Sequence, residues 1–190
     1  MSWGGQVLDT VAAEFSDVGD AAQLTRIVVR LMLASVLGFM LGFEREQHGK
    51  AAGVRTHMLV AIGSALFVLI PQQTGIVPGD MSRVIQGLVA GVGFLCAGTI
   101  LKQGRKEHQV QGLTTAAGLW MTAAIGMACG LGREVTAILS ALLALAVLAL
   151  VPRLVELVER MAGPPRAEDQ AGEAPRVIAS PEDQPPPPPR

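Results

Sequence analysis

The stretch Val135-Thr-Ala-Ile-Leu-Ser-Ala-Leu-Leu-Ala-Leu-Ala-Val-Leu-Ala-Leu-Val151 is 17 residues long and contains no charged residue. A helix in a soluble bundle keeps a polar face, and this stretch has none, which favours a helix surrounded by lipid. Four other apolar segments, at 24–43, 58–77, 84–101 and 113–132, are of similar length. A membrane span needs about 20 residues at ~1.5 Å each to cross a ~30 Å hydrocarbon core. The sequence therefore predicts an all-α fold, a polytopic helical membrane bundle with about five transmembrane helices.

The composition also favours a membrane protein. Of the 190 residues, 50% are hydrophobic and 16% are charged, whereas an average soluble domain has about 25% charged residues. The formal net charge is −1 and the basic residues are scattered, so we expect no nucleic-acid partner. The motifs G-x-S-x-G, H-E-x-x-H and G-x-x-x-x-G-K-[ST] are absent, which argues against an enzyme. We expect no cofactor, and the sequence leaves any metal site undefined.

The chain divides into four regions. Residues 1–23 form an N-terminal extracytoplasmic segment, in which Trp3, Val7, Val11 and Phe15 recur at the spacing of an amphipathic helix; a frayed terminus is the alternative. Residues 24–152 form the transmembrane domain, and residues 153–162 form the juxtamembrane end of its last helix. Residues 163–190 contain nine of the twelve prolines and are expected to form a disordered tail.

The distribution of basic residues predicts the orientation, because Lys and Arg near span ends stay on the cytoplasmic side. Nine of them lie in the loops 44–57 and 102–112 and, shortly after the last span, at Arg153, Arg160 and Arg166. Four lie towards the other side, at Arg26, Arg30, Arg83 and Arg133. This count places the N-terminus outside and the C-terminus in the cytoplasm. Arg26 and Arg30, inside the first span, oppose it unless both side chains extend outwards to water.

Glycines recur at four-residue spacing in three of the five apolar segments. Helices in a bilayer associate through close van der Waals contact at such faces. We therefore expect helix packing, within the chain or between copies in a homo-oligomer, at Gly38 and Gly42, at Gly87, Gly91, Gly93 and Gly98, and at Gly126 and Gly130.

Polar residues gather at the span ends that the topology places on the cytoplasmic side. They are Glu44, Arg45, Glu46, Arg55, Thr56, Thr114 and Thr115, while Asp80 and Arg83 lie on the opposite side. Such residues are costly in a bilayer unless they have partners. Two interpretations remain open, a vestibule that binds a partner or cation and a network of ion pairs that caps helix ends. In either case we expect Glu44 to pair with Arg55, because an antiparallel helix pair brings them to the same depth.

Several motifs follow one another in fixed order along the chain. They are Arg30-Leu31, Leu41-Gly-Phe-Glu-Arg-Glu46, Ala52-Gly-Val-Arg-Thr-His-Met-Leu-Val60, Ser82-Arg-Val84, Gly91-Val-Gly-Phe-Leu-Cys-Ala-Gly-Thr-Ile100 and Gly112-Leu-Thr-Thr-Ala-Ala-Gly-Leu-Trp120. Together these motifs closely resemble the MgtC/SapB family. The resemblance covers about residues 24–150. Cys96 departs from the family pattern, which has glycine there, and the proline-rich tail stands in place of the ACT-like domain of longer members.

The resemblance implies a bacterial inner-membrane protein linked to magnesium limitation and virulence. It also implies contact with the lipid bilayer and with other membrane proteins, among them the ATP synthase. Carried over by position, the matching residues are Glu44, Arg45, Glu46, Gly53, Arg55, Thr56, Arg83, Gly93, Phe94, Gly98, Gly112, Leu113, Thr115 and Trp120.

Two functions fit these features. The first is a regulator that acts by packing its helices against a membrane partner. The second is a carrier or channel for divalent cations such as Mg²⁺, which is usually held by one or two carboxylates. Asp80 at the outer rim and Glu44 or Glu46 at the inner rim could serve, but no carboxylate lies between the two rims. We favour the regulator.

Overall fold

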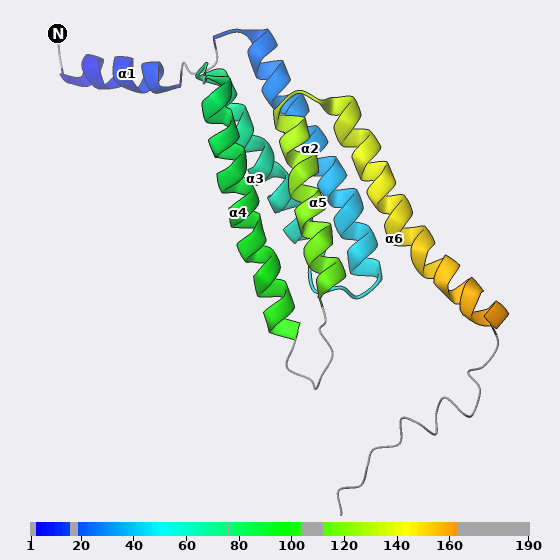
Figure 1. The fold of residues 1–190 in the computed structure, drawn as a ribbon. Coiled ribbons are helices and arrows are strands. Elements are labelled where there is room, and N and C mark those ends of the chain that lie inside the picture. Colours follow the sequence, from blue (N-terminus) through cyan, green and yellow to red (C-terminus); the bar gives the residue numbers. More distant parts are fainter. Residues whose placement is uncertain (1–2, 16–18, 76, 104–111, 163–190) are drawn as a thin grey trace, which may run out of the picture. The chain divides into compact units, whose positions relative to one another are not determined.

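The computed structural model describes residues 3–15, 19–75, 77–103 and 112–162. The predicted tail, 163–190, and most of the predicted loop 102–112 lie outside the described residues. The described part contains six helices and no strand, which confirms the all-α prediction, and Figure 1 shows how the helices are arranged. The helices are α1 (Trp3–Glu14), α2 (Ala21–Gln47), α3 (Val54–Gln73), α4 (Pro78–Gln103), α5 (Leu113–Gly130) and α6 (Glu134–Ala162).

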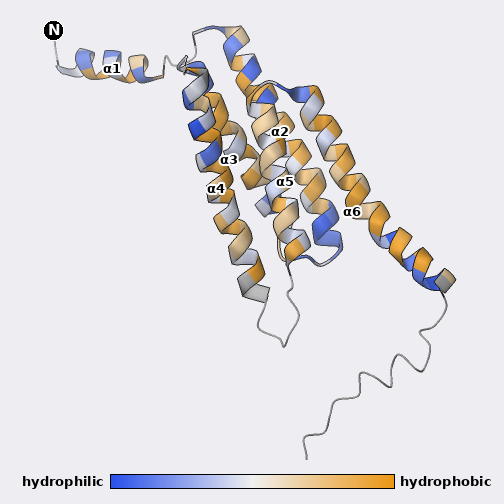
Figure 2. Cartoon of the chain, viewed as in Figure 1, coloured by the Kyte–Doolittle hydropathy of each residue, from blue (hydrophilic) through white to orange (hydrophobic). Residues whose placement is uncertain are grey.

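Five of these helices, α2 to α6, are long and apolar enough to cross a membrane. The shortest, α5, has 18 residues, which is within the range of membrane spans. Figure 2 shows hydrophobic residues along the middle of α2 and α6 and hydrophilic residues towards their ends. The chain is thus a membrane protein, and its described part contains the predicted number of candidate spans.

The helix bounds differ from the prediction at the connection between the first two spans. Helix α2 continues to Gln47 and α3 begins at Val54, so residues 48–53 replace the loop expected over 44–57. The Glu46 carboxylate accepts a hydrogen bond from the backbone N–H of Val54 at 2.9 Å, which allows the polar residues 55–57 to form the first turn of α3. Glu44, Arg45, Arg55 and Thr56 therefore lie on helices rather than in a loop.

The chain divides into two compact units. Residues 1–149 belong to one compact unit and residues from Leu150 onwards to another. Helix α1 exposes its apolar residues Trp3, Val7 and Val11, and its location at a membrane interface stays a prediction. Helix α6 passes through Pro152 without ending, so the predicted juxtamembrane segment 153–162 is a continuous part of it.

Helix α3 is central to the first unit, because it contacts α2, α4 and α5. The buried core consists mostly of small residues. Its members are Ala34, Leu37, Leu41, Ala61, Ala65, Ile125, Cys129, Ala137 and Ala141. Small side chains let helix backbones approach closely, which is how helices associate where water supplies no hydrophobic driving force.

Two of the three predicted glycine pairs lie at these close approaches. A Cβ atom added to Gly42 would lie 2.6 Å from Cα of Val54, and one added to Gly38 would lie 2.9 Å from the carbonyl oxygen of His57. On α5, a Cβ at Gly126 would collide with the carbonyl oxygen of Ala61. Gly130 meets the backbone of Ala65, one turn further along α3, in the same way. These glycines therefore hold α3 against α2 and α5.

The glycines of α4 behave differently. No described atom lies within 4 Å of a Cβ added to Gly87, Gly91, Gly93 or Gly98. All four residues are exposed on the described chain. Packing among the described residues therefore does not use these glycines, and the alternative of packing between chains remains.

Gly126→Ala should destabilise the bundle by about 1–3 kcal/mol, because the added methyl group forces the backbones of α3 and α5 apart. Thermal unfolding of the purified protein in detergent would show a lower midpoint. Gly63→Ala is the matched control, since no described atom lies within 4 Å of its added Cβ. That change should leave the midpoint unchanged or raise it slightly through higher helix propensity. Equal midpoints for the two variants would contradict the close contact of α3 and α5.

Candidate functional site

The predicted polar cluster lies where α2 ends and α3 begins, here called the Glu44 end. Arg45 is buried, with 4% of its side chain exposed, and Glu44 is 13% exposed. The Arg45 guanidinium donates from Nη2 to Oε1 of Glu44 at 2.7 Å, and its Nε donates to the other carboxylate oxygen. This is a two-point pair between guanidinium and carboxylate, the strongest common form of protein ion pair.

The predicted pair of Glu44 with Arg55 is wrong. Arg55 is exposed, and Glu44 instead lies between Arg45 and His48, whose Nδ1 is 3.2 Å from Oε1 of Glu44. Glu44 and Arg45 are neighbours on α2, and neighbouring side chains on a helix point about 100° apart. The sequence prediction therefore favoured Arg55, which was expected at the same depth on the next helix. The burial of the Arg45 guanidinium explains the outcome, because a buried cation requires a partner more than an exposed one does.

The Glu46 carboxylate joins the two helices at this end. Besides accepting the hydrogen bond from Val54, it lies so close over Gly53 that a Cβ there would be 2.6 Å from its Oε2. A negative charge at a helix N-terminus is stabilising, and glycine at 53 leaves room for it. These contacts match the interpretation of the cluster as ion pairs and helix caps.

His57 is a fully buried polar residue that the sequence prediction did not select. Its Nδ1 lies 3.0 Å from the carbonyl oxygen of Gly53, so in the neutral ring Nδ1 is the donor and Nε2 the acceptor. Nε2 has no hydrogen-bond partner among the described residues and faces Gly118 of α5. A buried acceptor without a donor is rare. It can accept a hydrogen bond from a donor between α3 and α5.

The other predicted residues are divided between two ends of the bundle. Thr115 is buried in the first turn of α5, whereas Thr56 and Thr114 are exposed. Asp80 and Arg83 form an exposed pair at 3.9 Å in the first turns of α4, away from the Glu44 end. Within the described residues, no three His, Cys, Asp or Glu side chains are grouped to hold a metal ion.

The sequence prediction also treated Arg30 differently from the structure. Instead of extending outwards to water, its guanidinium donates from Nη1 to Oε1 of Gln72 at 2.7 Å and to the carbonyl oxygen of Gly130 at 3.0 Å. Its Nε is 3.8 Å from the carboxylate of Glu134. The pairing of positions 30 and 72 follows from the register of the α2–α3 hairpin, in which Gly42 meets Val54 and Gly38 meets His57. This register is the signal from which the contact of Arg30 with Gln72 could have been predicted.

Glu44→Gln and Arg45→Gln should each destabilise the protein strongly, because each leaves a buried partner uncompensated, at a cost of about 3–5 kcal/mol. The double variant should be less destabilised than the sum of the two. A double-mutant cycle on the unfolding midpoint in detergent measures this coupling. The exposed pair is the control, and Asp80→Asn with Arg83→Gln should be nearly additive. Additivity at Glu44 and Arg45 would contradict the pair.

The chain is similar to several bacterial proteins. It is 47% identical to SrpB of Synechococcus elongatus over 116 residues, which is 54% of this chain and 62% of that one. It is 44% identical to MgtC of Brucella abortus over 128 residues, 66% of this chain and 51% of that protein. It is 41% identical over 128 residues to YhiD of Escherichia coli K12, which carries the provisional name of a magnesium transporter; the match covers 64% of this chain and 58% of YhiD.

The chain thus spans between half and two thirds of the length of the curated relatives it matches. No solved structure matches it. The sequence profile of the MgtC family matches residues 31–157, which include α3, α4, α5 and most of α2 and α6. The chain belongs to the MgtC family.

Proposed function

We propose that this protein is a regulator of the bacterial inner membrane that acts by packing α4 against a partner membrane protein. The observation that carries the proposal is the difference between the glycines of α4 and those of α2 and α5. Gly38, Gly42, Gly126 and Gly130 meet backbone atoms of α3, whereas Gly87, Gly91 and Gly98 of α4 meet no described atom. A helix face made for close approach is therefore left open.

Three of the open glycines form a continuous face, whereas Gly93 lies on the other side of α4. At 100° per residue, Gly87, Gly91 and Gly98 lie within about 40° of one another around α4. Phe94 lies on the same face and is 81% exposed, which gives the surface an apolar side chain beside its small residues. This arrangement admits the backbone of a second helix and offers a ring for it to pack against.

An apolar groove lies beside α4 on the same unit. Its volume is about 380 Å³, and α3 and α4 line it with Leu59, Gly63, Phe67, Leu88, Val92 and Leu95. Arg55 and Thr56 also line the groove. A partner helix could place apolar side chains in the groove and a polar group beside Arg55. Arg55 is exposed and takes no part in the ion pair of Glu44 and Arg45, so contact with a partner would give it a role.

The family resemblance suggests the partner and the context. The ATP synthase is the first candidate partner, and magnesium limitation is the proposed condition. We infer no catalytic role, because the contacts of Glu44, Arg45 and Glu46 are of the kind that hold helices together.

A carrier or channel for divalent cations is the second candidate. The name of the relative YhiD favours it, and so does the unpartnered Nε2 of buried His57. Uptake of Mg²⁺ into liposomes containing the purified protein distinguishes the two functions. Robust flux would replace the regulator by the carrier.

The proposed orientation has the N-terminus outside and the C-terminus in the cytoplasm, on the basis of the basic residues. Ser180→Cys, in a chain with Cys96→Ala and Cys129→Ala, should resist a membrane-impermeant thiol reagent in intact cells and react after the cells are opened. Labelling of intact cells would reverse the orientation.

Gly91→Leu should abolish most of the crosslinking between this protein and the ATP synthase in native membranes while leaving the unfolding midpoint unchanged. The reason is that the added side chain blocks the α4 face, yet no described atom lies within 4 Å of the added Cβ. Crosslinking followed by affinity capture measures the loss.

Gly79→Leu is the matched control on the same helix. Its added Cβ also meets no described atom, and it lies about 80° away from the face of Gly87. Crosslinking should persist in this variant. Undiminished crosslinking in Gly91→Leu would place the contact elsewhere.

A further inference from the structure

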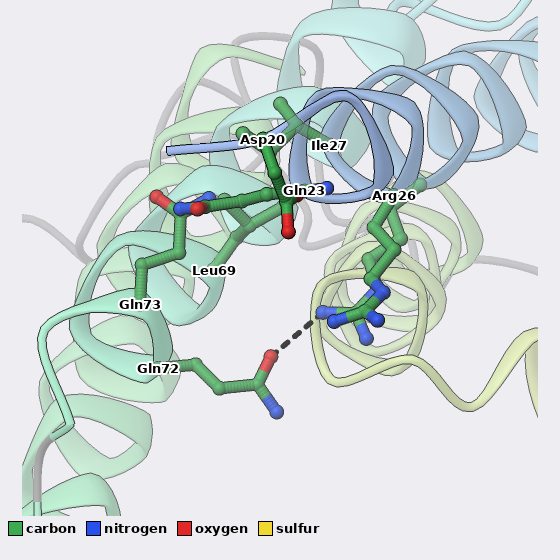
Figure 3. Close-up of a pocket in the computed structure, with 8 residues that line it drawn as sticks. Asp20, Gln23, Arg26, Ile27, Leu69, Gln72 and Gln73 are labelled. Carbon is green, nitrogen blue, oxygen red and sulfur yellow. Dashed lines mark hydrogen bonds between the residues drawn. The ribbon is translucent and has the colours of Figure 1, made fainter. Parts of the chain in front are cut away.

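A polar pocket opens at the end of the bundle opposite the Glu44 end, between the first turns of α2 and the last turn of α3. Its volume is about 400 Å³, and its polar lining consists of Asp20, Gln23, Arg26, Arg30, Gln72 and Gln73. In Figure 3 the side chains of Gln72 and Gln73 extend from α3 towards α2, which carries Arg26. We propose that this pocket binds the phosphate group of a membrane phospholipid through Arg26 and Arg30.

The depth of the pocket fits a lipid headgroup. Arg26 and Glu44 are 18 residues apart on α2, or about 27 Å at ~1.5 Å per residue. This length is close to the ~30 Å hydrocarbon core, so the two charged residues mark its two edges. Arg30 lies one turn deeper, ~6 Å from Arg26 along the helix. Lipid phosphates lie just outside the hydrocarbon core, at the level of Arg26.

Arg30 is held in place before any ligand arrives. Its guanidinium is fixed by Gln72, by the carbonyl oxygen of Gly130 and by Glu134. It also packs over Gly132, where an added Cβ would collide with Nη2. Gly132 has φ +72°, a conformation that favours glycine. The missing side chain at this position in turn leaves room for the Arg30 guanidinium. A fixed guanidinium loses little freedom on binding an anion.

Arg26, by contrast, has no ion pair or side-chain hydrogen bond within the described residues, although it lies one turn from Arg30 on the same face of α2. Asp20 is the carboxylate that lines the pocket, and its Oδ1 accepts a hydrogen bond from the backbone N–H of Gln23 at 2.6 Å as the cap of α2. The charge of Arg26 is therefore available to a ligand. Two guanidinium groups with neighbouring amides form a set of donors suited to phosphate oxygens.

The apolar part of the lining favours a lipid over a free anion. Ile27 and Leu69 complete the wall of the pocket, and Leu69 is buried. A phospholipid presents a phosphate and, beside it, apolar chains that can lie against these residues. Inorganic phosphate offers only the first of these contacts.

Binding can be measured with the delipidated full-length protein in detergent. The probes are dioctanoyl phosphatidylglycerol, dioctanoylglycerol, which lacks the phosphate, and inorganic phosphate. Native mass spectrometry counts the bound lipid, and the shift in unfolding midpoint gives its affinity. We expect the phospholipid to bind and to raise the midpoint, and the two other probes to have little effect.

Arg26→Gln should weaken phospholipid binding about tenfold or more, since one charged donor group is lost. Its midpoint without lipid should equal that of the unsubstituted protein, because Arg26 has no ion pair or side-chain hydrogen bond to lose among the described residues. Arg133→Gln is the matched control, an exposed arginine without a side-chain partner among the described residues, next to Glu134 in the chain. It should bind the lipid normally.

Three results would overturn the proposal. Equal lipid affinity of Arg26→Gln and the unsubstituted protein would remove Arg26 from the site. Equal binding of dioctanoylglycerol would show that the phosphate is not recognised. Binding of inorganic phosphate as tight as that of the lipid would make the pocket a site for a free anion.

Discussion

The structure depends on the close approach of α3 to α2 on one side and to α5 on the other. Four glycines permit it, and the space that their side chains would take is occupied by the backbone of α3 at Val54, His57, Ala61 and Ala65. In a bilayer, apolar side chains gain little by leaving lipid for protein, so contact distance and hydrogen bonding decide which helices associate. Because α3 has neighbours on both sides, its position sets the register of the whole first unit.

That register determines both polar ends of the bundle. Where α2 turns into α3, it brings the Glu46 carboxylate onto the backbone N–H of Val54. Near the opposite ends of the same two helices, it brings Arg30 to Gln72. The helices thus place a buried ion pair of Glu44 and Arg45 at one edge of the membrane and an arginine pocket at the other. Both follow from a connection of only a few residues, 48–53.

The sequence was sufficient for the helices and for much of their packing. Apolar length predicts five spans, and four-residue spacing identifies Gly38, Gly42, Gly126 and Gly130, because both signals are local. Partner choice is not local. Glu44 could pair with Arg45 or Arg55 on residue type, and the burial of one guanidinium, which depends on the packed fold, decides between them. The burial of His57 likewise depends on how α2 and α5 pack against α3. From the sequence alone, His57 is simply a histidine near the end of a predicted span.

The helix propensity of α4 bears on whether the protein acts alone. Glycine inside a helix is less favourable than alanine by about 0.5–1 kcal/mol, since it loses more backbone freedom on folding. In α2 and α5 the close contacts with α3 offset that cost. In α4, Gly87, Gly91 and Gly98, which share one face, carry the same cost without a contact in the described chain. A second helix packed against this face would supply the missing contact, and this is the energetic reason to look for the action of the protein in a complex rather than in the isolated bundle.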